Sequence, residues 1–264
     1  PECWKARYDA CQRGIAKVGE VLREAKPDVV VCFGDDQHEQ FLDDNMPAVS
    51  IFHGASFPVL HKHREGGPSW MKVEEHNWAQ TKPEYQANAD LALHLINSLV
   101  DQEFDVARTN RLRSEVGIGH AFSFLYRRVW PGSDVPLVPV MVNTYYPPNQ
   151  PTPKRCYKLG QAVRRAVESW PGSARVALFA SGGLSHVIVD EDVDQQAVEG
   201  MTANKPELLW ALPRERLIGG TSEILNWVAL AGAMEAESMT LVDYVTTYRS
   251  LAGTGVGAAF AYWN

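Results

Sequence analysis

The first part of the chain has the apolar periodicity of a long amphipathic helix. Within residues 3–26, large apolar side chains recur every three or four positions, at Trp4, Tyr8, Cys11, Ile15, Val18 and Leu22. This spacing lines them along one face of an α-helix, and Lys26-Pro27 supplies a stop because proline cannot continue a helix. We therefore predict a helix over 3–26.

Four apolar runs have the pattern of β-strands instead. They cover 28–33, 104–109, 135–142 and 176–180. The first and last are continuous apolar runs, the kind that parallel sheets bury on both faces. The run 135–142 contains prolines, which cannot donate to a strand ladder. We expect that run to lie at an edge of the sheet or to be irregular.

Helical spacing returns between and after these runs. Helices are predicted over 84–99, 121–130, 155–170, 195–201, 206–212, 222–233 and 241–248. Strands that alternate with helices predict an α/β fold with a central mixed or mostly parallel sheet flanked by helices. Neither a repeat nor a linker divides the sequence, so we expect a single domain over 1–264. Residues 54–83 are irregular, which is typical of a long functional loop.

Composition excludes several classes of function. The chain has 264 residues, 45% of them hydrophobic, and a net charge of −7 without a basic run. Binding to nucleic acid is therefore not expected, and no apolar segment reaches the roughly 18–20 residues that cross a membrane. The four cysteines form no C-x-x-C motif, which favours a reducing, cytoplasmic location. Because the chain opens on a helix without a methionine, we expect an N-terminal segment to be missing.

The most informative stretch is residues 176–186, where an apolar strand runs into a glycine turn and a histidine. Gly182 and Gly183 allow a tight turn that brings a ligand close to the backbone. His186 then lies just past the carboxyl end of the strand, where open α/β sheets place their chemistry. Imidazole is the natural proton carrier near neutral pH. The alternative is a glycine-rich turn with a surface histidine.

Two further segments carry acidic side chains at positions where chemistry is expected. Asp35-Asp36-Gln37-His38 follows a buried strand directly and could bind a metal, although a solvated acidic loop has the same pattern. Glu223 lies in the first turn of a helix that is apolar nearly all round. A carboxylate at this position is either stabilised by the helix dipole alone or, because the apolar helix is expected to be buried, needs a partner such as a metal.

A third segment, Gly117-Ile-Gly119-His120, puts another histidine at the start of a helix. Taken alone, His120 is equally explained as a structural histidine. One carboxylate and several histidines at loop positions together suggest a non-haem Fe(II) site of the 2-His-1-carboxylate type. Zinc with a bound water is the alternative.

Four spaced segments, in this order, resemble a known family. They are Asn143-Thr-Tyr-Tyr-Pro-Pro, Lys154-Arg-Cys-Tyr-Lys-Leu-Gly160, Ser181-Gly-Gly-Leu-Ser-His186 and Thr221-Ser-Glu-Ile-Leu-Asn-Trp227. The chain resembles the class III extradiol ring-cleavage dioxygenases, the superfamily of the protocatechuate 4,5-dioxygenase β subunit. The likeness runs from the first strand to the helix after Glu223, and the last two segments are the most specific.

The resemblance implies a mononuclear Fe(II) held by two histidines and a glutamate. A catechol-type substrate would chelate the iron through both hydroxyls, with O₂ beside it, and the ring would open next to the hydroxyls. Glu223 matches the glutamate ligand and His186 the histidine that acts as acid–base near O₂. His120 matches a second histidine that hydrogen-bonds the substrate. We therefore expect Glu223 and His186 to approach within about 10 Å.

The two histidine ligands of the family are harder to place. One belongs to a segment before the first long helix, and this sequence begins at that helix. The other follows an aspartate after the first strand. An ungapped alignment on Phe41 and Pro47 puts Gln37 there, and a shift of one residue puts His38 there. Because imidazole is the better donor for Fe(II), the sequence favours His38.

The resemblance also implies partners. Family members are often dimers or pair with a small helical subunit, so we expect a homo-oligomer, with such a subunit as a further partner. Arg155 and the 54–83 loop are candidates to pair with a substrate carboxylate, while the ring substituents stay unidentified. Two other functions stay open: a non-catalytic homologue without a complete metal site, and a hydrolase on the same scaffold with a zinc-bound water.

Overall fold

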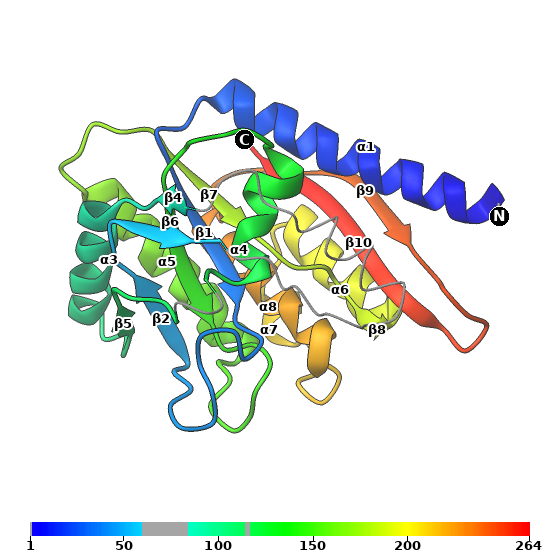
Figure 1. Ribbon diagram of the computed structural model, residues 1–264. Helices are drawn as coiled ribbons and strands as arrows, with labels where there is room; N and C mark the ends of the chain where they lie inside the picture. The colour runs from blue at the N-terminus through cyan, green and yellow to red at the C-terminus, as the bar shows by residue number, and fades with distance from the viewer. Residues whose placement is uncertain (1, 60–83, 114–116) are drawn as a thin grey trace.

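The computed structural model describes residues 2–59, 84–113 and 117–264, and it confirms the α/β class. Its central sheet has the strand order β5-β2-β6-β1-β7 (Figure 1). The strands are β1 (Val29–Asp35), β2 (Val49–Phe52), β5 (Ala107–Thr109), β6 (Leu137–Val142) and β7 (Val176–Ala180). Both β6 and β7 run parallel to β1, whereas β2 runs antiparallel to β6, so the sheet is mixed.

Two smaller sheets accompany the central one. The first is antiparallel with the order β8-β10-β9, and it consists of β8 (His186–Ile188), β9 (Met239–Thr246) and β10 (Thr254–Trp263). The second is the antiparallel pair of β3 (Ser56–Pro58) and β4 (Glu84–Gln86). The β8-β10-β9 sheet continues from the end of β7, because the backbone N–H of Leu184 donates to the carbonyl of Gly257 at 3.0 Å.

Helices flank the central sheet, as predicted (Figure 1). The α-helices are α1 (Glu2–Ala25), α3 (Ala89–Asp101), α4 (His120–Phe124), α5 (Pro153–Ser169), α6 (Glu191–Thr202), α7 (Pro206–Trp210) and α8 (Ile224–Ala233). A π-helical turn, η1 (Leu125–Val129), continues α4, and a 3₁₀ turn, η2 (Gly219–Glu223), leads into α8.

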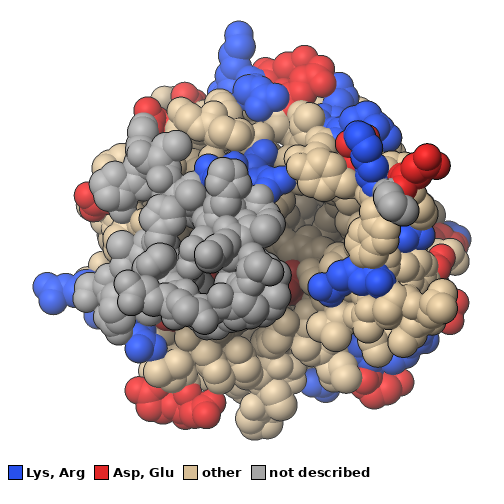
Figure 2. All heavy atoms as spheres, turned by 45° about the vertical axis from the view of Figure 1, so that its right-hand side comes forward, with Lys and Arg blue, Asp and Glu red and all other residues tan. Residues whose placement is uncertain are grey.

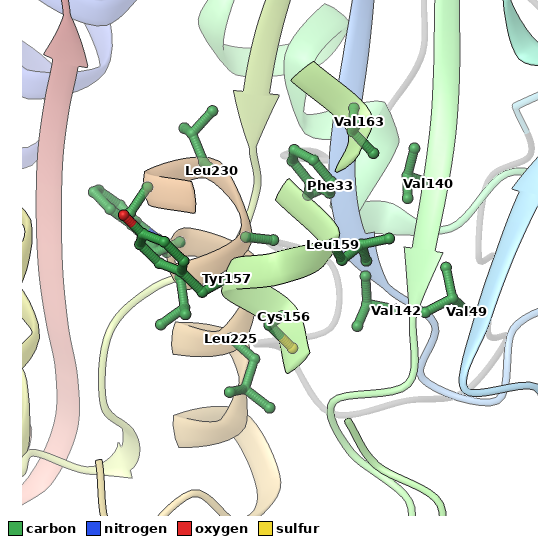
Figure 3. Packing of buried hydrophobic residues seen from close by; sticks show 14 of the residues in the cluster. Phe33, Val49, Val140, Val142, Cys156, Tyr157, Leu159, Val163, Leu225 and Leu230 are labelled. Atoms are coloured by element: carbon green, nitrogen blue, oxygen red, sulfur yellow. The ribbon is translucent and has the colours of Figure 1, made fainter. Parts of the chain in front are cut away.

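Alternate residues of β1 anchor two hydrophobic cores, one on each face of the sheet. Val29, Val31 and Phe33 pack with side chains of α3, α5 and α8. Figure 3 shows Phe33 beside Leu159 and Val163 of α5. Val30 and Cys32 point the other way and pack with α4 and η1. All five side chains are fully buried, and burial of one such side chain stabilises a fold by roughly 1.5–3 kcal/mol. These cores fix the carboxyl ends of β1 and its neighbours, where the candidate site lies.

The prediction that 135–142 lies at a sheet edge is wrong, because β6 lies between β2 and β1. The prolines are tolerated for a local reason. Pairing with β2 uses Val140, Met141 and Val142 and stops before Pro139. That ladder therefore needs no N–H from Pro139.

The predicted helix over 241–248 is also wrong, since Met239–Thr246 is strand β9. Thr240, Val242, Val245 and Thr246 are β-branched, and such side chains prefer strands. The partner of β9 is β10, which sequence periodicity did not reveal. Similarly, the helix expected over 84–99 begins only at Ala89, and residues 84–86 form β4.

One further observation concerns membranes. Across the three described ranges, none of the helices is both long and apolar enough to traverse a lipid bilayer.

Candidate active site

The candidate site forms where β1 and β7 end at the same edge of the sheet. The two strands are parallel neighbours, so Asp35 at the end of β1 lies beside the turn that follows β7. The backbone N–H of Ser181 donates to the carbonyl of Phe33 at 2.9 Å and fixes that turn. Gly182 has φ +125°, and a Cβ there would come within 2.9 Å of the Glu223 side chain. The turn therefore needs glycine for both its backbone and its contact.

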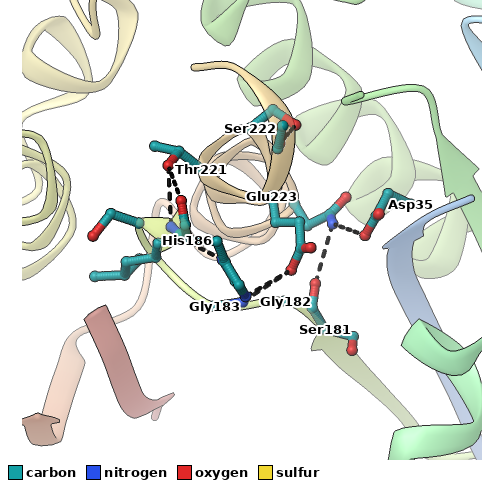
Figure 4. A network of polar contacts seen from close by, with 12 residues as sticks. Asp35, Ser181, Gly182, Gly183, His186, Thr221, Ser222 and Glu223 are labelled. Atoms are coloured by element: carbon teal, nitrogen blue, oxygen red, sulfur yellow. Dashed lines mark hydrogen bonds and ion pairs between the residues drawn. The ribbon is translucent and has the colours of Figure 1, made fainter. Parts of the chain in front are cut away.

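Glu223 connects this turn to the start of α8. It is buried, with 6% of its surface exposed, and its side chain does not cap α8. Instead, its Oε2 accepts a hydrogen bond from the backbone N–H of Gly183 at 3.1 Å (Figure 4). Its Oε1 accepts from Nε2 of Gln37, also at 3.1 Å. The carboxylate of Glu223 therefore points into the site and makes no capping hydrogen bond to α8.

Asp35 is a second buried carboxylate in the site. Nε2 of Gln37 donates to its Oδ2 at 3.1 Å and therefore bridges the carboxylates of Asp35 and Glu223. Nδ2 of Asn226, one turn into α8, donates to the other oxygen of Asp35 at 3.3 Å. Burial raises the pKa of Asp35 and of Glu223, and the charge of Asp35 raises the pKa of Glu223 further. Two buried carboxylates in one site favour a proton or a cation between them.

His186 approaches Glu223 closely, as expected. Its Nε2 lies 3.7 Å from Oε2 of Glu223. The backbone carbonyl of Leu184 lies 2.9 Å from Nδ1, and a carbonyl can only accept, so Nδ1 carries the proton and Nε2 faces Glu223. Thr221 holds the backbone of His186 through both its N–H and its carbonyl (Figure 4). Burial lowers the pKa of His186, which favours the neutral ring.

His120 lines the same cavity as Gln37, His186 and Glu223. It begins α4, and its Nδ1 lies 3.0 Å from Oε1 of Glu39. The structure therefore brings three of the four sequence-predicted site residues together.

The fourth predicted residue, His38, does not join them, which differs from the expectation that it is the metal ligand. Its ring stacks on Tyr146, with 3.7 Å between centroids, and its Nε2 lies 3.4 Å from Asp43. It is not among the side chains that line the cavity, whereas Gln37 is. The backbone of His38 has φ +57°, and this left-handed turn directs the neighbouring Gln37 toward Glu223.

A cavity of about 940 Å³ contains the site. Figure 2 shows a hollow on one face of the molecule, lined mainly by uncharged side chains. From the site, the cavity extends along β7 and residues 258–263 of β10, with α1 also contributing to its wall. Aromatic side chains of Phe124, Tyr145 and Trp227 lie around it. It is large enough for a substituted aromatic ring.

The metal expected at this site can be tested against the donor set. A buried carboxylate pair suits a divalent cation. However, within the ranges that the structure describes, no three His, Cys, Asp or Glu side chains gather closely enough to hold a metal ion. The described residues therefore include buried carboxylates, but they do not assemble the two histidines and one carboxylate that a 2-His-1-carboxylate site needs.

One participant, Glu39, was not singled out from the sequence, and one candidate lies elsewhere. The roles of Asp35, Gln37 and Glu39 depend on contacts across the fold that local spacing does not show. Arg155, considered for a substrate carboxylate, is not among the residues lining the cavity, and its guanidinium lies 3.9 Å from the ring centroid of Phe104. Residues 60–83 of the candidate loop lie outside the described residues.

Burial of the carboxylate pair predicts how the stability of the metal-free protein depends on pH. A carboxyl whose pKa is raised on folding keeps its proton while the unfolded chain releases it. The free energy of unfolding therefore falls as pH rises from the ordinary carboxyl pKa, about 4, to the raised value. The slope is about 1.4 kcal/mol per pH unit for each proton.

The variant Glu223→Gln should flatten this slope and be more stable than the chelator-treated wild type near pH 7. Urea unfolding from pH 4 to pH 9 measures the effect. Glu207→Gln, at an exposed position of α7, is the control. Identical slopes for Glu223→Gln and the wild type would contradict a raised pKa at Glu223.

Comparison with known proteins identifies the family of this chain. The model of the family described as the catalytic LigB subunit of aromatic ring-opening dioxygenase matches residues 2–261. A gallate dioxygenase from Pseudomonas putida is 33% identical over 167 residues, which cover 58% of this chain and 48% of that protein. A 2,3-dihydroxyphenylpropionate/2,3-dihydroxicinnamic acid 1,2-dioxygenase from Comamonas testosteroni is 27% identical over 180 residues, 67% of this chain and 49% of that protein.

A third relative, with the same enzyme name and from Cupriavidus necator, is 29% identical over 175 residues, 66% of this chain and 49% of that protein. In each case the match covers about half the length of the relative.

Proposed function

The chain belongs to the family of catalytic LigB subunits of aromatic ring-opening dioxygenases, and on this basis we propose that it is an extradiol dioxygenase. In this proposal it opens the ring of a catechol-type substrate with O₂. One observation carries the proposal beyond family membership: Glu223, His186 and His120 line one cavity at the carboxyl edge of β1 and β7. His120 and Glu223, which are 103 positions apart in the sequence, thus line the same cavity.

The proposed metal is Fe(II), with Glu223 as its carboxylate ligand. Enzymes of this family are metal-dependent, and in the described part of the chain the hydrogen bonds to the buried carboxylates of Asp35 and Glu223 come from uncharged amide groups. The incomplete donor set of the described residues is the reason that we derive no chemical step through the metal. The proposal concerns what this chain's own side chains do.

His186 is proposed as the acid–base residue. Its proton-bearing Nδ1 is fixed by the carbonyl of Leu184, so Nε2 is the nitrogen that can take or give a proton in the cavity. The lowered pKa keeps the ring neutral near pH 7, which is the state of a general base. His120 is proposed to hydrogen-bond the substrate from another side of the same cavity.

The function is tested with the full-length protein purified without oxygen and supplied with Fe(II). We expect O₂ uptake, and a ring-cleavage product by mass spectrometry, with at least one of catechol, gallate and 2,3-dihydroxyphenylpropionate. The last two are the substrates that the relatives' names give. Iron-loaded protein that binds a catechol but neither consumes O₂ nor changes the ring would contradict the proposal.

A second candidate is a non-catalytic member of the family. The observation that favours it is Gln37. The ungapped alignment on Phe41 and Pro47 puts this amide side chain at the position of the family's metal-binding histidine. Iron content separates the candidates. A full-length protein that takes up no iron, yet keeps its cavity and binds a catechol, is a binding subunit.

Substitution of Gln37 and of His38, the two candidates for the metal-binding position after β1, is expected to have different effects on metal affinity. Gln37→Ala removes the hydrogen bond that orients Glu223, so metal affinity should fall by about 10–100-fold, the usual effect of losing a partner of a metal ligand. His38→Ala removes the ring that stacks on Tyr146 and approaches Asp43 but does not line the cavity, so metal affinity should stay within about twofold of the wild type. Calorimetric titration with Fe(II) or Mn(II) measures both, and the reverse order would restore His38 as the ligand.

Assembly and location complete the proposal. A homo-oligomer, with or without a small helical subunit, is expected from the family, and light scattering of the purified full-length protein tests it. A cytoplasmic location is supported by the four cysteines, each of which is a free thiol in the structure.

A further inference from the structure

Glu39 is a buried carboxylate that neither the sequence motifs nor the proposed mechanism uses. It follows β1 by four residues and exposes only 3% of its surface. A carboxylate is costly to bury without strong hydrogen bonds, so its partners indicate why it is retained. The described partners of Glu39 include the backbone and ring of His120, 81 positions away in the sequence.

The carboxylate of Glu39 holds His120 at two points. Its Oε1 lies 3.0 Å from Nδ1 of the ring. Both carboxylate oxygens also accept from the backbone N–H of His120, at 3.3 and 3.2 Å. An ionised carboxylate can only accept a hydrogen bond, so the ring nitrogen that it faces carries the proton. The contact with the backbone N–H holds the carboxylate in place.

The preceding residue, Gly119, makes this close contact sterically feasible. A Cβ at position 119 would collide with Oε2 of Glu39. Gly119 has φ −61°, a value that alanine adopts freely. Glycine at this position is therefore explained by the carboxylate beside it and not by backbone conformation.

We propose that Glu39 is a positioning residue, which holds the proton of His120 on Nδ1 and thereby turns Nε2 toward the cavity. The inference rests on the proposed function, because it assumes that His120 meets the substrate. It assigns the two cavity histidines different partners. His186 has the neutral carbonyl of Leu184 at its Nδ1, whereas His120 has a carboxylate.

Different partners have different chemical consequences. Both arrangements fix the same tautomer, but only a carboxylate also stabilises the imidazolium form. The geometry thus points to His120, in its imidazolium form, as a hydrogen-bond donor to the substrate through Nε2, and to His186 as the neutral base.

The test uses protein with ¹⁵N-labelled histidine, at a pH where the neutral ring is observed. In the wild type, the His120 ring should show a protonated Nδ1 and an unprotonated Nε2, with His120→Gln identifying the signals. Glu39→Ala should redistribute the proton between the two nitrogens. Gly119→Ala should do the same, because its methyl group displaces the carboxylate without removing it.

Two variants make the result specific. Glu39→Gln keeps an oxygen acceptor, so it should retain the tautomer while it loses the charge. Asp43→Ala, at an exposed position of the same loop, should leave the His120 signals unchanged. If Glu39→Ala or Gly119→Ala folds and leaves the nitrogen shifts of His120 as in the wild type, the inference is wrong.

Ring cleavage supplies a second and separable measurement. In active full-length protein, Glu39→Ala should lower kcat/KM by about 10–100-fold, with Glu39→Gln in between. A wild type without ring cleavage would count against the proposed function, while the nitrogen signature would still test the role of Glu39. Active wild type with an unchanged signature in Glu39→Ala would overturn the role of Glu39 alone.

Discussion

Replacement of Glu223 by alanine is expected to remove both the bound metal and all measurable ring cleavage. The carboxylate is 6% exposed and is oriented by the N–H of Gly183 and the amide of Gln37. Nothing else in α8 can replace its charge, because Ile224 and Leu225 follow it directly. Loss of a charged ligand should exceed the 10–100-fold effect of losing an orienting partner. Iron per chain and single-turnover product formation are the measurements.

The stability of the metal-free Glu223→Ala protein shows whether the variant has lost its metal or its fold. We expect its free energy of unfolding to be higher than that of the metal-free wild type. Burial raises the pKa of Glu223, so the ionised group is unfavourable in the folded protein, and its removal relieves that cost. Glu207→Ala, on exposed α7, should keep wild-type iron and activity. A folded Glu223→Ala protein with a full complement of iron would exclude Glu223 as a ligand.

Local patterns were sufficient to predict the elements that meet at the site. The continuous apolar run at 176–180, the two glycines and His186 lie within eleven residues, and each does what its residue type favours. The strand at 28–33 and the apolar helix after Glu223 were predicted for the same reason. Where the physical cause lies within one element, the sequence is informative.

Contacts between distant segments could not be predicted in this way. Strand β9 is defined by its ladder with β10, and its β-branched residues also fit an apolar helical pattern when read alone. The proline-containing β6 is central because its pairing with β2 ends before Pro139. Neither cause is visible in the periodicity of the segment itself.

The choice between Gln37 and His38 shows the same limit within the site. Chemistry favoured imidazole, but His38 has φ +57°, and it is the Gln37 side chain that hydrogen-bonds to Glu223. Such a left-handed conformation is unusual for a residue other than glycine. The partner of His120 was likewise unpredictable, because Glu39 is 81 positions away.

Replacement of His186 should leave the metal in place and slow the reaction. His186→Ala and His186→Gln should bind iron and a catechol as the wild type does, because Nε2 lies 3.7 Å from Glu223, too far to support that carboxylate through a hydrogen bond. Turnover should fall by about 10²–10⁴-fold, which is the usual contribution of a positioned proton carrier. Single-turnover ring cleavage at saturating catechol measures this loss.

The proposed role of His186 also predicts the direction in which turnover changes with pH. A general base acts in its neutral form, so activity that depends on His186 rises as pH increases through the pKa of this ring. Burial lowers that pKa, so the midpoint of the rise should lie below pH 6.5, about the ordinary value for histidine. His186→Gln should lose this acidic limb, whereas His94→Gln, on the far helix α3, should retain it. Loss of iron from His186→Ala as complete as from Glu223→Ala would instead make His186 a metal ligand, because a proton carrier alone does not retain the metal.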